Sequence, residues 1–271
     1  MQAEYARIPF ASVNCVKLPE HVTDQQAILI SDICPTGWFG ADLAEVSEGD
    51  TVAVFGCGPV GQFSIVSAFM MGAGRVFAVD REESRLEMAR AQGVEAINFV
   101  EEDPVQVIYE LTGNIGVDRV IEAVGVDAEP PESGPAAQQS AQPQEQAQAE
   151  LEQVAPETNP QNDLWIPGQA PSQSLLWSTQ AVKKAGVIGV FPPPAMTAPI
   201  GDVQQRNLTV RGGNCNHRKY IPQLVGLVAT GALDPTEVLT QTEPVTDAIE
   251  AYEVFDRRRP GWINVELTPA A

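Results

Sequence analysis

The sequence predicts an α/β protein with a doubly wound parallel sheet. Apolar runs of strand length alternate with segments of helical periodicity, which is the pattern of a parallel sheet covered by helices. The first such run leads directly into the glycine-rich segment Gly56–Gly61, and the second ends at the acidic residue Asp80. With 44% hydrophobic residues in 271, the chain can bury a substantial core, which excludes a wholly disordered protein.

The expected elements follow one another with recognisable boundaries. Thr51–Phe55 is a continuous apolar run, typical of a strand buried on both faces. Asp103 and Pro104 predict an N-cap and a first helical position, and Gly113 ends that helix. The expected strands are 51–55, 75–79, 95–99, 117–124, 187–191, 208–211 and 262–267. The expected helices are 62–71, 82–92, 104–113, 175–184, 221–230 and 245–256.

The charge and cysteine pattern narrow the class of protein. The chain has 36 acidic and 16 basic residues, a net charge of −20, which argues against nucleic acid or an anionic membrane as a partner. No apolar run is long enough to span a bilayer, and the N-terminus lacks the pattern of a signal peptide. The four cysteines are scattered without a C-x-x-C pair, so we expect reduced thiols and a cytoplasmic location.

Residues 126–174 differ in composition from the rest of the chain. Pro, Gln, Ala and Glu dominate, and eight acidic residues without any Lys or Arg supply −8 of the net charge. Such a composition buries too little apolar surface to offset its ordering entropy, so we expect a mobile, low-complexity acidic insertion. A short helix across Gln144–Val154 is compatible with the pattern. Both a solvated loop and a partner-binding segment remain open.

The segment Gly56–Gly61 reads G-x-G-x-x-G between an expected strand and an expected helix, the context of a dinucleotide-binding fingerprint. Gly56 allows a tight turn, Gly58 lets a pyrophosphate approach the backbone, and Gly61 lets the helix pack closely on the strand. The free N–H groups at the helix N-terminus favour the phosphates. Taken alone, the hexapeptide could also be a purely structural turn.

Asp80 lies 19 residues after Gly61, at the end of the second expected strand. An acid here accepts hydrogen bonds from the adenosine ribose and repels a 2′-phosphate, which favours NAD over NADP. Asp80 could also cap the helix that follows. Arg81 is a further candidate cofactor-binding residue, and it points toward NADP because an arginine here can accept a 2′-phosphate. Together the strand, glycine turn, helix, strand and acid predict a Rossmann dinucleotide-binding domain.

Three further segments carry a resemblance to a known family. They are LISDICPTGWFGA at 29–41, AEYARIPFA at 3–11, and a C-terminal region that includes 234–237 and 248–256. Together they resemble the zinc-dependent medium-chain alcohol dehydrogenases, nearest to the glutathione-independent formaldehyde dehydrogenase-like branch. The resemblance covers nearly the whole chain except the insertion, and the segments occur in the family's order.

This resemblance implies hydride transfer between an alcohol or aldehyde (hydrate) and nicotinamide, with zinc polarising the substrate oxygen. It places Asp32 at the position of a zinc ligand and Thr36 beside the nicotinamide. A helix cap is the alternative role for Asp32. The other implied cofactor contacts are Gly56, Gly58, Pro59, Val60, Gly61, Asp80, Arg85, Val124, Gly125, Gly189 and Val190.

Several expected family features are absent from this sequence. There is no G-H-E motif and no cysteine cluster, and the only histidines are His21 and His217, for which we expect exposed positions. A catalytic zinc needs three protein ligands, so Asp32 alone cannot hold it, and we expect a truncated chain with an incomplete zinc site. Asn264 stands where relatives often have a basic residue directed at the pyrophosphate.

The resemblance also implies a division into parts and an assembly. We expect the end of a GroES-like catalytic domain at 1–44, an NAD-binding domain at 45–213 interrupted by 126–174, and a return to the catalytic domain at 214–271. Relatives pair their coenzyme domains through the sixth strand, which implies a homo-oligomer. Two other functions remain open: a non-catalytic dinucleotide-binding protein, and an interaction protein that acts through the acidic insertion.

Overall fold

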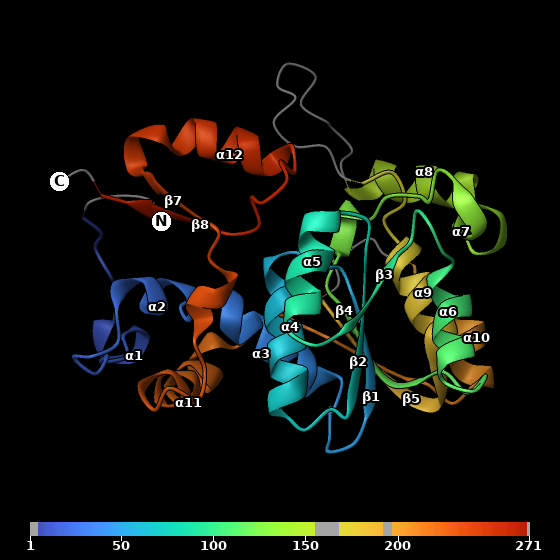
Figure 1. Cartoon of the computed structure of the whole chain (residues 1–271), viewed down its shortest axis with the longest axis horizontal. Coiled ribbons are helices and arrows are strands. Elements are labelled where there is room, and N and C mark those ends of the chain that lie inside the picture. The colour runs from blue at the N-terminus through green and yellow to red at the C-terminus, as the bar shows by residue number, and fades with distance from the viewer. Residues whose placement is uncertain (1–4, 155–167, 192–196, 270–271) are drawn as a thin grey trace.

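Six parallel strands form the central sheet of the computed structural model, which describes residues 5–154, 168–191 and 197–269 (Figure 1). The strand order is β3-β2-β1-β4-β5-β6, so the chain starts in the middle of the sheet and builds outward in both directions. This order confirms the predicted doubly wound α/β fold. The strands are β1 (Thr51–Phe55), β2 (Arg75–Asp80), β3 (Glu95–Asn98), β4 (Val117–Glu122), β5 (Val182–Val190) and β6 (Thr209–Gly212).

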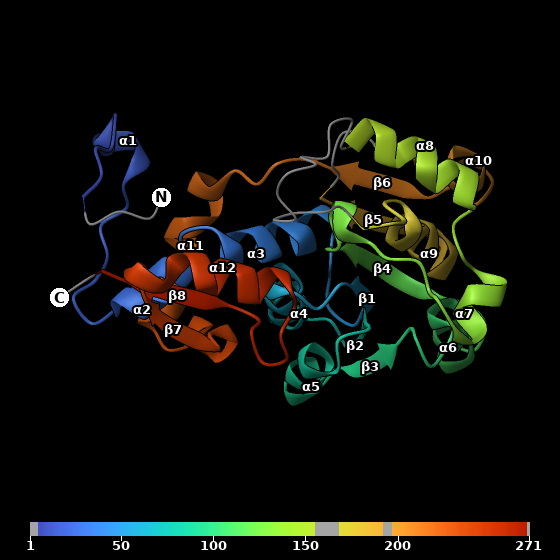
Figure 2. The ribbon, with the colours of Figure 1, turned by 90° about the horizontal axis from the view of Figure 1, so that it is seen from above.

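Alternate side chains of these strands enter two separate cores, one on each face of the sheet. In β1, Val52 and Val54 belong to one core, whereas Ala53 and Phe55 belong to the other. Both faces are covered by helices, as a buried parallel sheet requires (Figure 2). The first face carries α3 (Ile33–Leu43), α4 (Pro59–Met70) and α5 (Glu83–Ala91), and the second carries α6 (Pro104–Leu111), α9 (Gln173–Ala181) and α10 (Ile200–Gln205).

Helix α3 approaches its neighbours at backbone distance. A Cβ on Gly37 would lie 2.6 Å from the carbonyl carbon of Phe63 in α4. A Cβ on Gly189 in β5 would lie 2.7 Å from the carbonyl oxygen of Gly40 in α3. A side chain at either position would push the helix away, so these contacts require glycine. Gly37 and Gly40 lower the helix propensity of this segment, and the sequence pattern did not indicate α3.

A third core joins the beginning of the chain to its end, beside the sheet (Figure 1). Leu29 and Trp38 pack there with Tyr220 and Leu224. The elements of this part are α1 (Ala11–Asn14), α2 (Asp24–Leu29), α11 (His217–Ala229), β7 (Gln241–Pro244), α12 (Ala248–Asp256) and β8 (Val265–Thr268), and β7 pairs in parallel with β8. Within the described residues, no helix is long and apolar enough to cross a membrane.

The expectation of a mobile insertion is wrong for the part of 126–174 that the structure describes. Helix α7 (Gly134–Gln139) buries Ala136 completely, in the core of the second sheet face. Helix α8 (Gln144–Val154) has the bounds expected from the sequence. Residues 155–167 lie outside the described part. The described part of the insertion is therefore a packed layer over this region of the protein.

Polar side chains hold this layer in place. The Ser140 hydroxyl donates to the Asp103 carboxylate at 2.7 Å and accepts from the indole N–H of Trp177 at 2.8 Å. The Gln142 amide donates to the carboxylate of Glu150 at 2.8 Å, and both residues are buried. These hydrogen bonds help to hold the layer, whose few apolar side chains bury too little surface to do so alone.

The boundary between α9 and β5 also differs from the expectation of a helix over 175–184. The helix ends at Ala181, and β5 begins at the buried residue Val182. The guanidinium of Arg206 donates to the carbonyl oxygens of Gln180 and Val182. The Gln180 carbonyl also accepts from the Tyr109 hydroxyl at 3.1 Å, so residues distant in sequence satisfy the carbonyls at this helix end.

Candidate functional site

The turn after β1 has two glycines that the backbone requires and one that borders open space. Gly56 has a φ of +89°, which favours glycine. A Cβ on Gly61 would lie 1.8 Å from the Gly56 carbonyl oxygen. A Cβ on Gly58 would meet only Arg85 Nη1, at 3.8 Å. Gly58 is also the N-cap of α4, whose first residue Pro59 needs no hydrogen-bond acceptor.

The carboxylate of Asp80 is oriented toward this turn by three backbone donors. Its Oδ2 accepts from the N–H of Cys57 at 2.7 Å, and its Oδ1 accepts from the N–H groups of Arg81 and Glu82 at 2.7 and 2.9 Å. Arg85 Nη1 lies 4.0 Å from Oδ2. Asp80 is 7% exposed, so its orientation is fixed while one edge still reaches open space.

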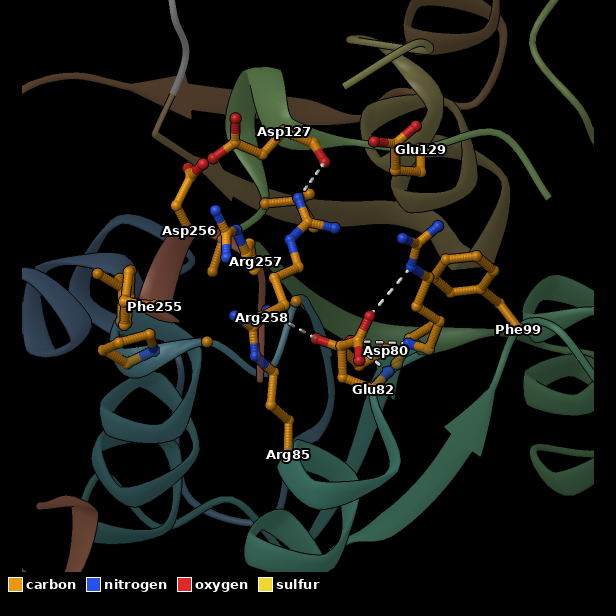
Figure 3. Close-up of a pocket in the computed structure, with 18 residues that line it drawn as sticks. Asp80, Glu82, Arg85, Phe99, Asp127, Glu129, Phe255, Asp256, Arg257 and Arg258 are labelled. Atoms are coloured by element: carbon orange, nitrogen blue, oxygen red, sulfur yellow. Dashed lines mark hydrogen bonds and ion pairs between the residues drawn. The ribbon is translucent and has the colours of Figure 1, made fainter. Parts of the chain in front are cut away.

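A cavity of about 530 Å³ opens at the carboxyl ends of β1, β2 and β4 (Figure 3). Its size is typical of a small-molecule or cofactor pocket, and open parallel sheets bind ligands at this edge. The walls come from the glycine turn, the end of β2, the loop after β4 and the segment that follows α12. The charged lining residues are Asp80, Glu82, Asp127, Glu129, Asp256, Arg81, Arg85, Arg257 and Arg258.

The structure brings most of the predicted cofactor residues to this cavity and leaves others outside its lining. Those that line it are Gly56, Gly58, Pro59, Val60, Asp80, Arg81, Arg85 and Val124. Gly61 lies beneath the turn, and Gly189 faces α3. Gly125 starts a single 3₁₀ turn, and Val190 is 2% exposed in the core. Thr36 is also outside the lining and belongs to the cluster described below.

Several lining residues were not anticipated from the sequence. Asp127 and Glu129 belong to the insertion, in which neither of them was predicted to bind the cofactor. Phe255 and Asp256 at the end of α12, and Arg257 and Arg258 directly after it, reach the cavity from the C-terminal part of the chain. The available signal was the run Arg257–Arg259, since three consecutive arginines stand out in a chain of net charge −20.

Buried Glu122 holds the loop that carries Val124 into the cavity. Its Oε1 accepts from the N–H groups of Val124 and Gly125 at 2.9 and 3.0 Å, and from the Ser174 hydroxyl at 2.8 Å. The pKa of this carboxyl is raised above its ordinary value, because the effect of burial outweighs the lowering effect of these three donors. Its Oε2 is buried without a hydrogen-bond partner among the described residues. The strand expected to reach Val124 therefore ends at Glu122 because the next backbone donors turn back to it.

Asp32, Thr36 and His217 form a second polar cluster, at the start of α3. His217 Nε2 lies 2.7 Å from Asp32 Oδ1 and 3.3 Å from Thr36 Oγ1. Asp32 occupies the N-cap position, but its side chain makes no capping bond. His217 is the first residue of helix α11 and not a loop residue as expected, and its side chain is 38% exposed. His21 is exposed, as expected.

This cluster does not form a zinc site by itself. Among the described residues, no three His, Cys, Asp or Glu side chains are grouped so as to hold a metal ion. Burial raises the pKa of the Cys34 thiol to about 12 and that of the Cys215 thiol to about 11. Both thiols are therefore protonated near neutral pH, whereas a metal binds the thiolate. Within the same part of the chain, the predicted ligand Asp32 is not joined by the two further protein ligands that a catalytic zinc needs.

Comparisons with known proteins agree with this geometry. The family model described as zinc-binding dehydrogenase matches residues 59–133. A zinc-type alcohol dehydrogenase-like protein AdhB of Bacillus subtilis is 36% identical over 99% of this chain and 66% of its own length. An alcohol dehydrogenase of Cupriavidus necator is 30% identical over 99% of this chain and 63% of its own length.

A solved structure shows the same arrangement of elements. Alcohol dehydrogenase TADH from Thermus sp. ATN1 superposes with a TM-score of 0.78 at 28% identity, covering 100% of this chain and 65% of the enzyme. The chain thus spans about two thirds of the length of the relatives it matches. Sequence and structure together place it in one family: the chain belongs to the zinc-type alcohol dehydrogenases.

Proposed function

We propose that the chain is the cofactor-binding part of an NAD-dependent oxidoreductase that transfers hydride between an alcohol or aldehyde (hydrate) and nicotinamide. The observation that carries this proposal is that the open side of Gly58 and the oriented carboxylate of Asp80 face the same cavity. The substrate class comes from the related alcohol dehydrogenases, of whose length this chain spans about two thirds.

The lining residues fit NAD from its phosphates outward. Gly58 presents backbone without a Cβ, and the free N–H groups at the start of α4 suit a pyrophosphate. Asp80 Oδ2 accepts one hydrogen bond, from Cys57, and can accept another from a ribose hydroxyl. Bound NAD supplies the nicotinamide carbon that exchanges hydride, while this chain binds the cofactor and fixes its orientation.

The charges around the ribose position favour NAD over NADP. Asp80, Glu82 and Glu129 line the same cavity, and a 2′-phosphate would bring further negative charge among them. Arg81 could accept such a phosphate, but its Nε lies 3.2 Å from Glu82 Oε1 in an ion pair. The arginine that argued for NADP is therefore already partly neutralised.

Titration calorimetry of the purified chain tests the proposal. We expect NAD to bind and NADP to bind about tenfold more weakly or not at all. Because binding does not need the catalytic part of the longer relatives, the measurement is independent of turnover. A chain without measurable affinity for NAD or ADP-ribose would refute the cofactor assignment.

We propose Asp32 as one zinc ligand, with further ligands supplied from outside the described residues, and Thr36 as a contact to the nicotinamide. An aspartate at this position is the feature that favours the formaldehyde dehydrogenase-like branch. Supporting this role, the Asp32 side chain is 72% exposed, so its carboxylate has room for an additional partner besides His217.

The proposed assembly uses the edge of the sheet. Every residue of β6 (Thr209–Gly212) is exposed, and within the described part of the chain only β5 pairs with it. Such an edge is suited to pairing with the same strand of a second copy, which would give a homo-oligomer. The third core supports the division into 1–44, 45–213 and 214–271. The four free cysteines support a cytoplasmic location.

A further inference from the structure

One segment from the end of the chain reaches across to the cofactor cavity. Helix α12 ends at Asp256, and the two arginines that follow line the cavity wall. Arg258 has a φ of +52°, a left-handed backbone conformation that is uncommon for a residue with a side chain. Figure 3 shows the Arg257 and Arg258 side chains between Asp127 on one wall and Arg85 on the other.

Arg258 differs from the other lining arginines in its partners. Each of the others lies within 4.0 Å of a carboxylate: the pairs are Arg81–Glu82, Arg85–Asp80 and Arg257–Glu253. Arg258 Nη2 instead donates to the backbone carbonyl of Asp127 at 3.4 Å. Within the described part of the chain it makes no ion pair. Arg258 thus keeps its full positive charge and most of its five N–H donors for a ligand.

A cofactor diphosphate adds negative charge to a space that five carboxylates and four arginines line. Three of these arginines already lie beside a carboxylate, which leaves Arg258 as the lining cation without one in the described part of the chain. Asn264, at the position where the resemblance implies a basic residue, is a neutral amide that is 6% exposed and outside the cavity lining. Its Nδ2 is buried without a hydrogen-bond partner among the described residues. Position 264 therefore supplies no positive charge to the cavity.

We propose that Arg258 binds the diphosphate of the cofactor, in place of a basic residue at position 264. A guanidinium offers parallel N–H donors that match two phosphate oxygens, and a charge-assisted pair of this kind is stronger than a neutral hydrogen bond. The phosphates would then be held from two sides, by the turn at Gly58 and by Arg258 from the C-terminal segment. This inference rests on the proposed function, because it names a further contact of the same cofactor.

The test uses the full chain and two matched variants. Arg258→Asn removes the charge but keeps a residue that tolerates the left-handed backbone, so the turn after α12 should be preserved. Arg259→Asn removes the same charge from the exposed neighbour, which does not line the cavity. Calorimetry would measure adenosine, ADP, ADP-ribose and NAD against each protein, with thermal melting as the check on folding.

We expect Arg258→Asn to weaken ADP, ADP-ribose and NAD by about tenfold or more, to leave adenosine within about twofold, and to reduce the salt dependence of NAD binding. Arg259→Asn should bind all four ligands like the wild type. Arg258→Lys keeps the positive charge but lacks the paired N–H donors of the guanidinium. Its affinity for ADP, ADP-ribose and NAD should lie between those of the wild type and Arg258→Asn, which provides a second test if the asparagine variant folds poorly.

Equal binding of ADP-ribose by wild type and Arg258→Asn would overturn the inference and leave the proposed function intact. Equal losses for adenosine and ADP would also overturn it, because they would show a general effect on the pocket. Failure of the wild-type chain to bind any of these ligands would instead refute the proposed function, and this inference with it.

Discussion

The carboxylate of Asp80 accepts a hydrogen bond from the backbone N–H of Cys57 at 2.7 Å. This contact joins the end of β2 to the turn after β1 across the carboxyl edge of the sheet. One acid therefore shapes the backbone that would face the phosphates and also presents an oxygen to the ribose. Because both roles depend on the same carboxylate, losing it should affect structure and binding together.

Replacing Asp80 with alanine should weaken NAD binding by about tenfold or more and lower stability by about 1–3 kcal/mol. The variant leaves the Cys57 N–H buried without its acceptor and removes the ribose contact. Calorimetry and urea unfolding measure the two effects. Glu87→Gln, which removes an exposed negative charge from α5, should change neither. Unchanged NAD affinity in the Asp80 variant would exclude it from the cofactor site.

Gly61→Ala should destabilise the protein by about 3 kcal/mol or more, since its Cβ would lie 1.8 Å from the Gly56 carbonyl oxygen. The matched control is Gly226→Ala in α11, where a Cβ meets nothing within 4 Å. That change should stabilise the helix by about 0.5–1 kcal/mol. Thermal or urea unfolding of both variants would compare them. A Gly61→Ala protein as stable as the wild type would contradict the close turn.

Glu122 should make stability fall as pH rises. Burial raises the pKa of its carboxyl in the folded state above the ordinary value of 4.5, so the folded protein holds this proton more tightly. The stability that this carboxyl contributes is fully present below about pH 4.5 and is lost as the pH rises through the raised pKa. In Glu122→Gln this dependence disappears. Urea unfolding from about pH 5 to about pH 8 should therefore show the wild type losing stability relative to the variant. Parallel curves would contradict the raised pKa.

Ser140→Ala should cost about 1 kcal/mol, because it removes the hydroxyl that joins the insertion to Asp103 and Trp177. Asp103→Ala should cost about 1–3 kcal/mol, since it also removes the N-cap bond to the Gln106 N–H at 2.9 Å. Ser133→Ala, in the same insertion, removes an exposed hydroxyl that makes no capping bond and should stay within about 0.5 kcal/mol. If Ser140→Ala matched Ser133→Ala in urea unfolding, the insertion would not be anchored through this hydroxyl.

The parts of the fold that local pattern determines could be predicted from the sequence. The strand Thr51–Phe55, the N-cap at Asp103 and the helix Gln144–Val154 all agree with the structure. Each depends on neighbouring residues: a continuous apolar run, a capping side chain, or a stretch of good helix formers. The glycine turn and Asp80 were predictable for the same reason, as motif and spacing lie within one βαβ unit.

The remaining features depend on contacts between distant residues. The carbonyls at the end of α9 are satisfied by Arg206 and Tyr109, and the insertion is held by Asp103 and Trp177. The reach of Arg258 into the cavity follows from the path of the chain after α12, and the contact of His217 with Asp32 joins residues 185 positions apart. Composition alone gives no sign of such partners, so the insertion was expected to be unpacked.

The glycine contacts of α3 have a mechanical consequence. With Gly37 against α4 and Gly40 against β5, the helix has no side-chain layer along which it could slide. Helix α3 should therefore move together with α4 and the sheet as one body. We expect movement that opens the cavity for cofactor entry to involve its other walls, among them the segment after α12. Restraining that segment should slow cofactor exchange more than it changes equilibrium affinity.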